Sequence, residues 1–232
     1  MKTKLLLLPG MDGTGDLFAG FVEAFPDEFE TEIVSYPTDV FLSYSELMPL
    51  IHSATPPTEP FVLVAESFST PLAIQYAATN PPNLKGLVLC AGFVTSPVRG
   101  WLLFFCSLLS PVLIRPSLPM WVVRLLLVGA TAPQPLLAAV STAVSSVKPT
   151  VMSARFRAVI SCDARVELGR VSVPILYVQA TQDRLVPESC LDEIQRIKPE
   201  MTVAKIVGPH LILQREPRQA AEVVAEFVHK LL

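Results

Sequence analysis

The sequence has few histidines and cysteines to hold metal ions, and it lacks the excess of positive charge that binds nucleic acids. It has three histidines, His52, His210 and His229, and none of them stands at a metal-ligand spacing from another His or from a Cys. The four cysteines form no CxxC pair, which indicates reduced, packed thiols and a cytoplasmic protein. Lys and Arg total 18 against 21 Asp and Glu, and no basic block occurs. We therefore expect no metal, no cofactor and no nucleic-acid partner.

Long apolar runs are also missing. The longest, residues 101–114, contains Pro111 and has an arginine close to each end, so it falls short of the ~20 residues that span a bilayer. The leucines at 5–8 follow two lysines, but they are too few for a signal peptide, whose apolar region has about 7–15 residues. We interpret residues 5–8 as part of the first core strand.

What the sequence does have is a series of short runs rich in Val, Leu and Ile, most of them continuous, which is typical of parallel strands buried on both faces. These are residues 4–8, 31–35, 61–65, 86–90, 175–180 and 202–207. Helical patterns alternate with them, at residues 16–24, 45–52, 71–78, 187–197 and 217–232. The alternation predicts an α/β protein with a mainly parallel, doubly wound sheet of about six strands.

The alternation breaks between residues 96 and 150. Seven prolines fall in this stretch, and prolines at that density divide a chain into short helices. It contains no convincing strand. We predict an inserted helical cap at 96–150, lying over the carboxyl edge of the sheet, and a core made of residues 1–95 and 151–232.

The stretch FVLVAESFSTPLAIQYAA, residues 61–78, has two interpretations. Either Ser67 is presented on a tight strand-to-helix turn, or serine and threonine simply cap the next helix, with Pro71 in its first turn. The capping interpretation explains Ser69 and Thr70. It does not explain Ser67, or the small residue two places on either side of it.

Residues that follow the other strands favour the first interpretation, because ligands of an open parallel sheet bind outside the carboxyl ends of its strands. Ser67 follows the third predicted strand, Asp183 the fifth and His210 the sixth. All three are therefore expected at one edge. The plainer roles are a core or capping histidine and an aspartate that caps the helix near 187. Asp163 is a rival acid, but it precedes its strand and is expected at the opposite edge.

The chain order Ser, Asp, His at this edge resembles the α/β-hydrolase superfamily over nearly the whole chain. The motifs that carry the resemblance are LLLLPGMDGTG, VLVAESFST, YVQATQDRLVP and VGPHLILQREP. The family's G-x-S-x-G is Ala65-Glu66-Ser67-Phe68-Ser69 here, and its common His-Gly is Pro9-Gly10. We expect the two antiparallel strands that usually open the family's sheet to be missing, because residues 5–8 already form the first predicted strand. Glu66 is either structural or tunes His210.

The resemblance implies a role for each site residue. Ser67 would be the nucleophile, His210 the general base and Asp183 the group that orients the imidazole. The backbone N–H groups of Met11 and Phe68 would form the oxyanion hole. Asp12 and Thr14 would shape the glycine-rich turn. The cap would line an acyl pocket with Trp101, Phe104, Phe105 and Leu125.

We therefore expect a serine carboxylesterase that acts on small apolar esters of short to medium acyl chain. It is similar to small cytoplasmic esterases of the pimeloyl-carrier-protein methyl ester type. One alternative is an acyltransferase or thioesterase, since LPGMDGTG resembles a stretch of plastid phytyl ester synthases. Others are a noncatalytic ligand-binding protein and a weak contact of the cap with a membrane surface or an acyl carrier. A nucleotide site is disfavoured, because the glycines reverse the dinucleotide spacing and no GK[ST] follows.

Overall fold

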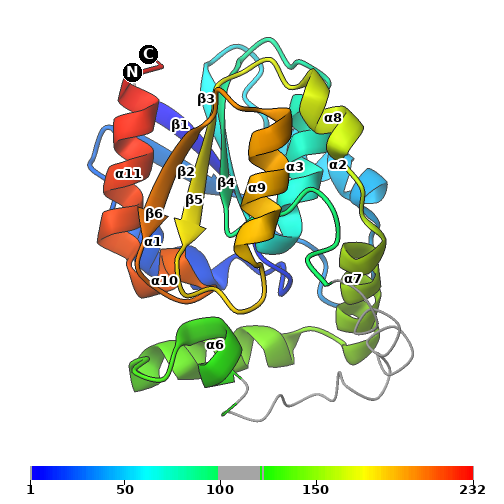
Figure 1. The fold of residues 1–232 in the computed structure, drawn as a ribbon, viewed down its shortest axis with the longest axis vertical. Helices are drawn as coiled ribbons and strands as arrows, with labels where there is room; N and C mark the ends of the chain where they lie inside the picture. The colour runs from blue at the N-terminus through cyan, green and yellow to red at the C-terminus, as the bar shows by residue number, and fades with distance from the viewer. Residues whose placement is uncertain (1, 99–120, 122, 232) are drawn as a thin grey trace.

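A six-stranded parallel sheet forms the centre of the protein (Figure 1). The computed structural model describes residues 2–98, 121 and 123–231. All five strand pairings are parallel, and the strand order is β2-β1-β3-β4-β5-β6. The strands are β1 (Thr3–Leu8), β2 (Phe29–Ile33), β3 (Phe61–Glu66), β4 (Leu84–Cys90), β5 (Ile175–Ala180) and β6 (Thr202–Ile206). The predicted sheet is confirmed, with bounds within two residues.

Helices cover both faces because the strands are apolar on both faces. In β1, Leu6 and Leu8 point to one buried cluster and Leu5 and Leu7 to the other. One face is covered by α2 (Tyr44–Ala54), α3 (Thr70–Ala77), α8 (Arg165–Arg170) and α9 (Glu188–Ile197). The other is covered by a short 3-10 turn η1 (Asp16–Phe18), α1 (Ala19–Glu23), α10 (Ile212–Arg215) and α11 (Pro217–His229). The sequence did not indicate α8 or α10 as helices.

Beyond β4 the chain leaves the sheet and returns through helices. These are a π-helical segment η3 (Val123–Val128), α6 (Gln134–Ser146) and α7 (Pro149–Ser161). Figure 1 shows α6 across from the edge where the strands end. There α6 and η3 form a small apolar cluster with Leu17 and Leu211 from the core. Proline stands in the first turn of both α6 and α7, where its missing N–H has no helical partner to lose.

Of the four residues predicted to line the acyl pocket, the structure describes only Leu125. Trp101, Phe104 and Phe105 lie outside the described residues, and the cap boundaries stay a prediction. Leu125 lies on η3 with 45% of its surface exposed. Within the described ranges, no single helix is long and apolar enough to cross a membrane; α6 and α7 pass that test only as a pair, and they are bent by 97°.

Candidate active site

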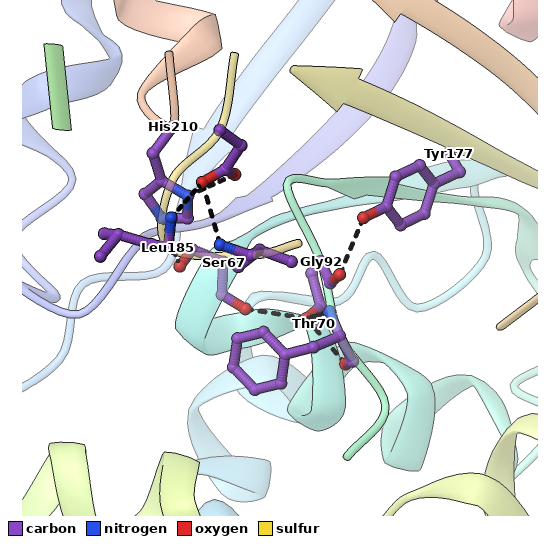
Figure 2. Close-up of polar contacts among 9 residues, drawn as sticks. Ser67, Thr70, Gly92, Tyr177, Leu185 and His210 are labelled. Atoms are coloured by element: carbon purple, nitrogen blue, oxygen red, sulfur yellow. Dashed lines mark hydrogen bonds and ion pairs between the residues drawn. The ribbon is translucent and has the colours of Figure 1, made fainter. Parts of the chain in front are cut away.

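Ser67 stands at the tip of a strained turn between β3 and α3. Its φ is 48°, in the left-handed region that a non-glycine residue seldom adopts. The turn passes through a single 3-10 turn, η2 (Ser67–Ser69), and joins α3 directly. Thr70 supports it from below, because its hydroxyl donates to the Ser67 carbonyl at 2.8 Å and accepts from the Phe93 N–H at 3.1 Å (Figure 2). The fold around Ser67 therefore holds a conformation that the residue alone disfavours.

The alternative interpretation, in which the side chain of Ser69 or Thr70 caps α3, is wrong. No side chain caps this helix. Instead, the Ser69 hydroxyl donates to the Pro9 carbonyl, and the Tyr36 hydroxyl lies 2.7 Å from Ser69 Oγ. Because Ser69 donates to Pro9, Tyr36 is the donor in the second contact. The small residue after the turn therefore ties it to the glycine-rich loop that follows β1.

His210 joins Ser67 to Asp183 in one hydrogen-bonded chain. Its Nε2 lies 2.8 Å from Ser67 Oγ and its Nδ1 lies 2.7 Å from Asp183 Oδ2. The other carboxylate oxygen of Asp183 accepts the N–H groups of Leu185 and Val186, at 2.8 and 2.9 Å. In Figure 2 the His210 ring points toward Ser67. Asp183 is thus held by the turn before α9, and it does not cap that helix, whose N-cap is Pro187.

The surroundings of His210 raise the pKa of its imidazole. The side chains of His210 and Asp183 are only 4% and 5% exposed. Burial lowers the pKa of His210, but the hydrogen bond and charge of Asp183, together with Glu66, outweigh it and raise the pKa above its ordinary value. Since a carboxylate only accepts, Nδ1 carries the proton toward Asp183, and Nε2 is left to accept from the Ser67 hydroxyl.

The predicted oxyanion donor Met11 lies in a tight turn of the glycine-rich loop. Gly13 donates to the Gly10 carbonyl at 3.0 Å and closes a tight turn. Because the Gly10–Met11 peptide is trans, the Met11 N–H points away from the interior of that turn. Within the described part of the chain it has no hydrogen-bond acceptor. As predicted, Asp12 and Thr14 shape the loop, since Asp12 Oδ1 accepts the Thr14 N–H at 3.0 Å.

Phe68 offers the second N–H group that was predicted. It lies in the first turn after β3, where N–H groups have no partner in their own helix. Its side chain is buried against Tyr44, with ring centroids 5.1 Å apart. The backbone at Phe68 is therefore fixed by packing.

Solved structures share this arrangement of strands and helices. An esterase from Thermogutta terrifontis is 18% identical, with a TM-score of 0.79 over 100% of this chain and 91% of that one. A lipase-esterase related protein from Clostridium acetobutylicum is 13% identical, with a TM-score of 0.79 over 97% and 94% of the two chains. MGS-M2, an α/β-hydrolase enzyme from a Medee basin deep-sea metagenome library, is 14% identical, with a TM-score of 0.75 over 98% and 90%. This chain has the α/β-hydrolase fold. No model of a known protein family matches the sequence, and no curated protein matches it.

Within this α/β-hydrolase fold, sequence reasoning missed the environment of Glu66. Its side chain is 2% exposed, and one carboxylate oxygen accepts from Gln214 Nε2 at 3.2 Å. The other oxygen has no partner among the described residues. Burial is the main cause that raises the pKa of Glu66 to about 7, against the opposing effect of His210. The only sequence signal was an acid that directly continues a buried apolar strand.

The rival acid Asp163 and the other two histidines take no part in the hydrogen bonds that join Ser67, His210 and Asp183. Asp163 is exposed, and both its carboxylate oxygens accept from Arg165, at 2.9 and 2.6 Å. Its backbone pairs with Thr95. His52 packs its ring 5.0 Å from that of Tyr76, and His229 lies 3.0 Å from a Glu28 carboxylate oxygen at the surface. Of the two predicted acids, Asp183 is the one that contacts His210.

Proposed function

We propose that the protein is a serine carboxylesterase that hydrolyses apolar esters of short to medium acyl chain. The single observation that carries the proposal is the hydrogen-bonded chain from Ser67 through His210 to Asp183 at a strained strand-to-helix turn. Such a chain activates a hydroxyl that is a weak nucleophile by itself. Two proteins with similar folds, the esterase from Thermogutta terrifontis and the lipase-esterase related protein from Clostridium acetobutylicum, give further support.

The mechanism follows from the order of contacts. Ser67 Oγ attacks the ester carbonyl carbon while His210 Nε2 takes the hydroxyl proton. The tetrahedral oxyanion accepts hydrogen bonds from the N–H groups of Met11 and Phe68. Such donors stabilise the negative charge most strongly in a site that excludes water. His210 then gives the proton to the leaving alcohol, and an acyl-Ser67 ester remains. Water, deprotonated by His210, hydrolyses this ester and restores Ser67. Asp183 keeps the imidazole in the required tautomer and stabilises it when charged.

The substrate class rests on the composition of the cap. Residues 96–150 carry both tryptophans of the chain and are rich in leucine and valine, so an apolar acyl chain suits this segment. We propose that the pocket accepts acyl chains of short to medium length. Leu125, exposed on η3, is the described residue that we propose to contact the acyl chain.

The test is hydrolysis of p-nitrophenyl esters from acetate to palmitate by the wild type and by Ser67→Ala. We expect the substitution to lower kcat by ~10⁴–10⁶, as losses of triad members do. Circular dichroism checks that the variant is folded. Turnover near that of the wild type in Ser67→Ala would end the assignment. Addition of an alcohol, with analysis of products, separates hydrolysis from acyl transfer.

A matched pair of substitutions tests the acid. Asp183→Asn keeps the shape of the side chain but removes the charge that orients His210, so we expect kcat to fall by ~10⁴. Asp163→Asn removes an exposed carboxylate that pairs with Arg165, and we expect activity within about tenfold of the wild type, a change of ~1.4 kcal/mol in the barrier. Equal losses in both variants would show that the acid is wrongly assigned.

A further inference from the structure

Arg155 is a buried cation that contacts backbone carbonyls of the glycine-rich loop. It lies on α7, and 1% of its surface is exposed. Its Nη1 donates to the carbonyls of Met11 and Asp12, at 3.0 and 2.7 Å, and its Nη2 donates to that of Pro37 at 2.8 Å. Among the described residues no carboxylate forms an ion pair with it. A buried charge is costly unless it is well hydrogen-bonded, so three carbonyls on two loops compensate this one.

Two of these carbonyls belong to the turn that presents the Met11 N–H. The Gly10 carbonyl is fixed inside the turn by Gly13, and the next two carbonyls are fixed outside it by Arg155. Three successive peptide planes are therefore held in place. The orientation of the Met11 N–H is set by the first of them, and Arg155 prevents the following two from rotating.

The guanidinium also packs directly on Gly13. A Cβ added to Gly13 would lie 2.6 Å from Arg155 Nη1 and 2.9 Å from Cζ, closer than real contacts allow. Gly13 has a φ of 71°, which favours glycine as well. The side chain of Met11 packs near the same helix, in a cluster with Val151 and Met152. The first two turns of α7 therefore hold Met11 through both its carbonyl and its side chain.

We propose that Arg155 is a positioning residue for the oxyanion hole. Its guanidinium holds residues 10–13 so that the Met11 N–H faces the substrate oxygen as that oxygen becomes anionic. The inference rests on the proposed esterase function. It predicts a loss confined to transition-state stabilisation, because Arg155 is too deeply buried to touch the substrate.

The first experiment compares Arg155→Met and Arg155→Lys with Arg157→Met, an exposed arginine on the same helix. We expect Arg155→Met to lower kcat by ~10²–10³, the loss typical of one oxyanion donor, with KM nearly unchanged. Affinity for a trifluoromethyl ketone, which forms a tetrahedral adduct, falls in parallel. Lysine keeps the charge but not the planar fork, so Arg155→Lys is intermediate. Arg157→Met stays at the wild-type rate. A wild-type kcat in Arg155→Met, or a change in KM alone, would overturn the proposal.

The second experiment approaches the contact from the loop. Gly13→Ala displaces the guanidinium, so we expect it to lower kcat as well. Because both changes break one contact, the double variant Gly13→Ala/Arg155→Met should lose far less than the product of the two single losses. Losses that simply multiply would mean that the turn and Arg155 act independently, and the proposal would fail.

A third measurement does not depend on esterase activity. Hydrogen exchange of the amides in residues 10–15 should be faster in Arg155→Met than in Arg157→Met, because the turn loses its anchor. If the wild type hydrolyses no ester, the proposed function fails, and exchange still decides whether Arg155 holds the turn. Unchanged exchange at these amides would refute the inference even if the esterase function is correct.

Discussion

At the scale of single residues, the burial of Glu66 makes stability depend on pH. The ionisable groups that face it are His210, Asp12 and the buried thiol of Cys90. Burial is the largest effect, and it raises the pKa of Glu66 from 4.5 to about 7. The folded chain therefore binds this proton more tightly than the unfolded chain does. The resulting stabilisation is complete below pH 4.5 and is lost as the pH rises through about 7.

Glu66→Gln should remove this pH dependence. The glutamine fills the same space and stays neutral, so we expect the variant to be more stable than the wild type above pH 7 by on the order of 3 kcal/mol, and nearly equal to it at pH 4. Urea unfolding at a series of pH values measures this difference. Glu222→Gln, at an exposed position on α11, controls for the loss of one negative charge. A constant difference across the pH range would contradict the prediction.

At the scale of elements, the junction of β3 and α3 depends on the Thr70 hydroxyl. Thr70 is fully buried and bonds to backbone groups of Ser67 and Phe93. Thr70→Val preserves the shape but leaves the buried Phe93 N–H without its acceptor, and the Ser67 carbonyl keeps only the backbone N–H of residue 70 as a donor. We expect a loss of about 1–3 kcal/mol in the free energy of unfolding. The strained φ of Ser67 should relax as well, which lowers kcat.

Thr79→Val is the matched control for Thr70→Val. Thr79 lies just beyond the end of α3, is exposed, and its hydroxyl donates to the Tyr76 carbonyl. Water can replace this bond, so we expect a change of less than ~0.5 kcal/mol. Urea unfolding of both variants is the measurement. Equal losses would mean that burial of the Thr70 hydroxyl contributes nothing special to the turn.

Elements were predictable from the sequence where a local pattern determines them. Short runs rich in Val, Leu and Ile identified all six strands. The central strands are continuous apolar runs, because buried parallel strands need apolar residues on both faces, whereas the edge strands β2 and β6 are partly exposed. The position of Ser67, Asp183 and His210 after three of those strands brought them to one edge. Arg155 was not predictable, since its carbonyl partners Met11 and Asp12 are 144 and 143 residues away and carry no side-chain signal. Ser69 was misjudged for the same reason: its partner Pro9 is distant in sequence.

At the scale of the whole molecule, the described end of the predicted cap is attached to the loop that carries His210. The Leu211 N–H donates to the Leu127 carbonyl at 2.9 Å, and the Lys148 N–H donates to that of Thr38 at 2.9 Å. A small cluster built on Leu137 of α6 reaches Leu17 and Leu211 in the core. The two clusters within the sheet layers are much larger. The cap is therefore joined to the core by contacts that can weaken while the core stays intact.

Leu137→Ala should weaken this attachment selectively. Leu137 is fully buried, and such truncations cost ~2–5 kcal/mol. Both tryptophans, Trp101 and Trp121, lie in residues 96–150, so tryptophan fluorescence follows the cap and far-ultraviolet circular dichroism follows mainly the core. We expect the two urea transitions to coincide in the wild type and to separate in Leu137→Ala, with fluorescence changing first. Leu125→Ala, at an exposed leucine of η3, should leave the two transitions coincident. A separable cap must lose its structure before the sheet does, so the two transitions must then differ. If they stay coincident in Leu137→Ala, the cap and the core unfold as one unit, and the prediction is wrong.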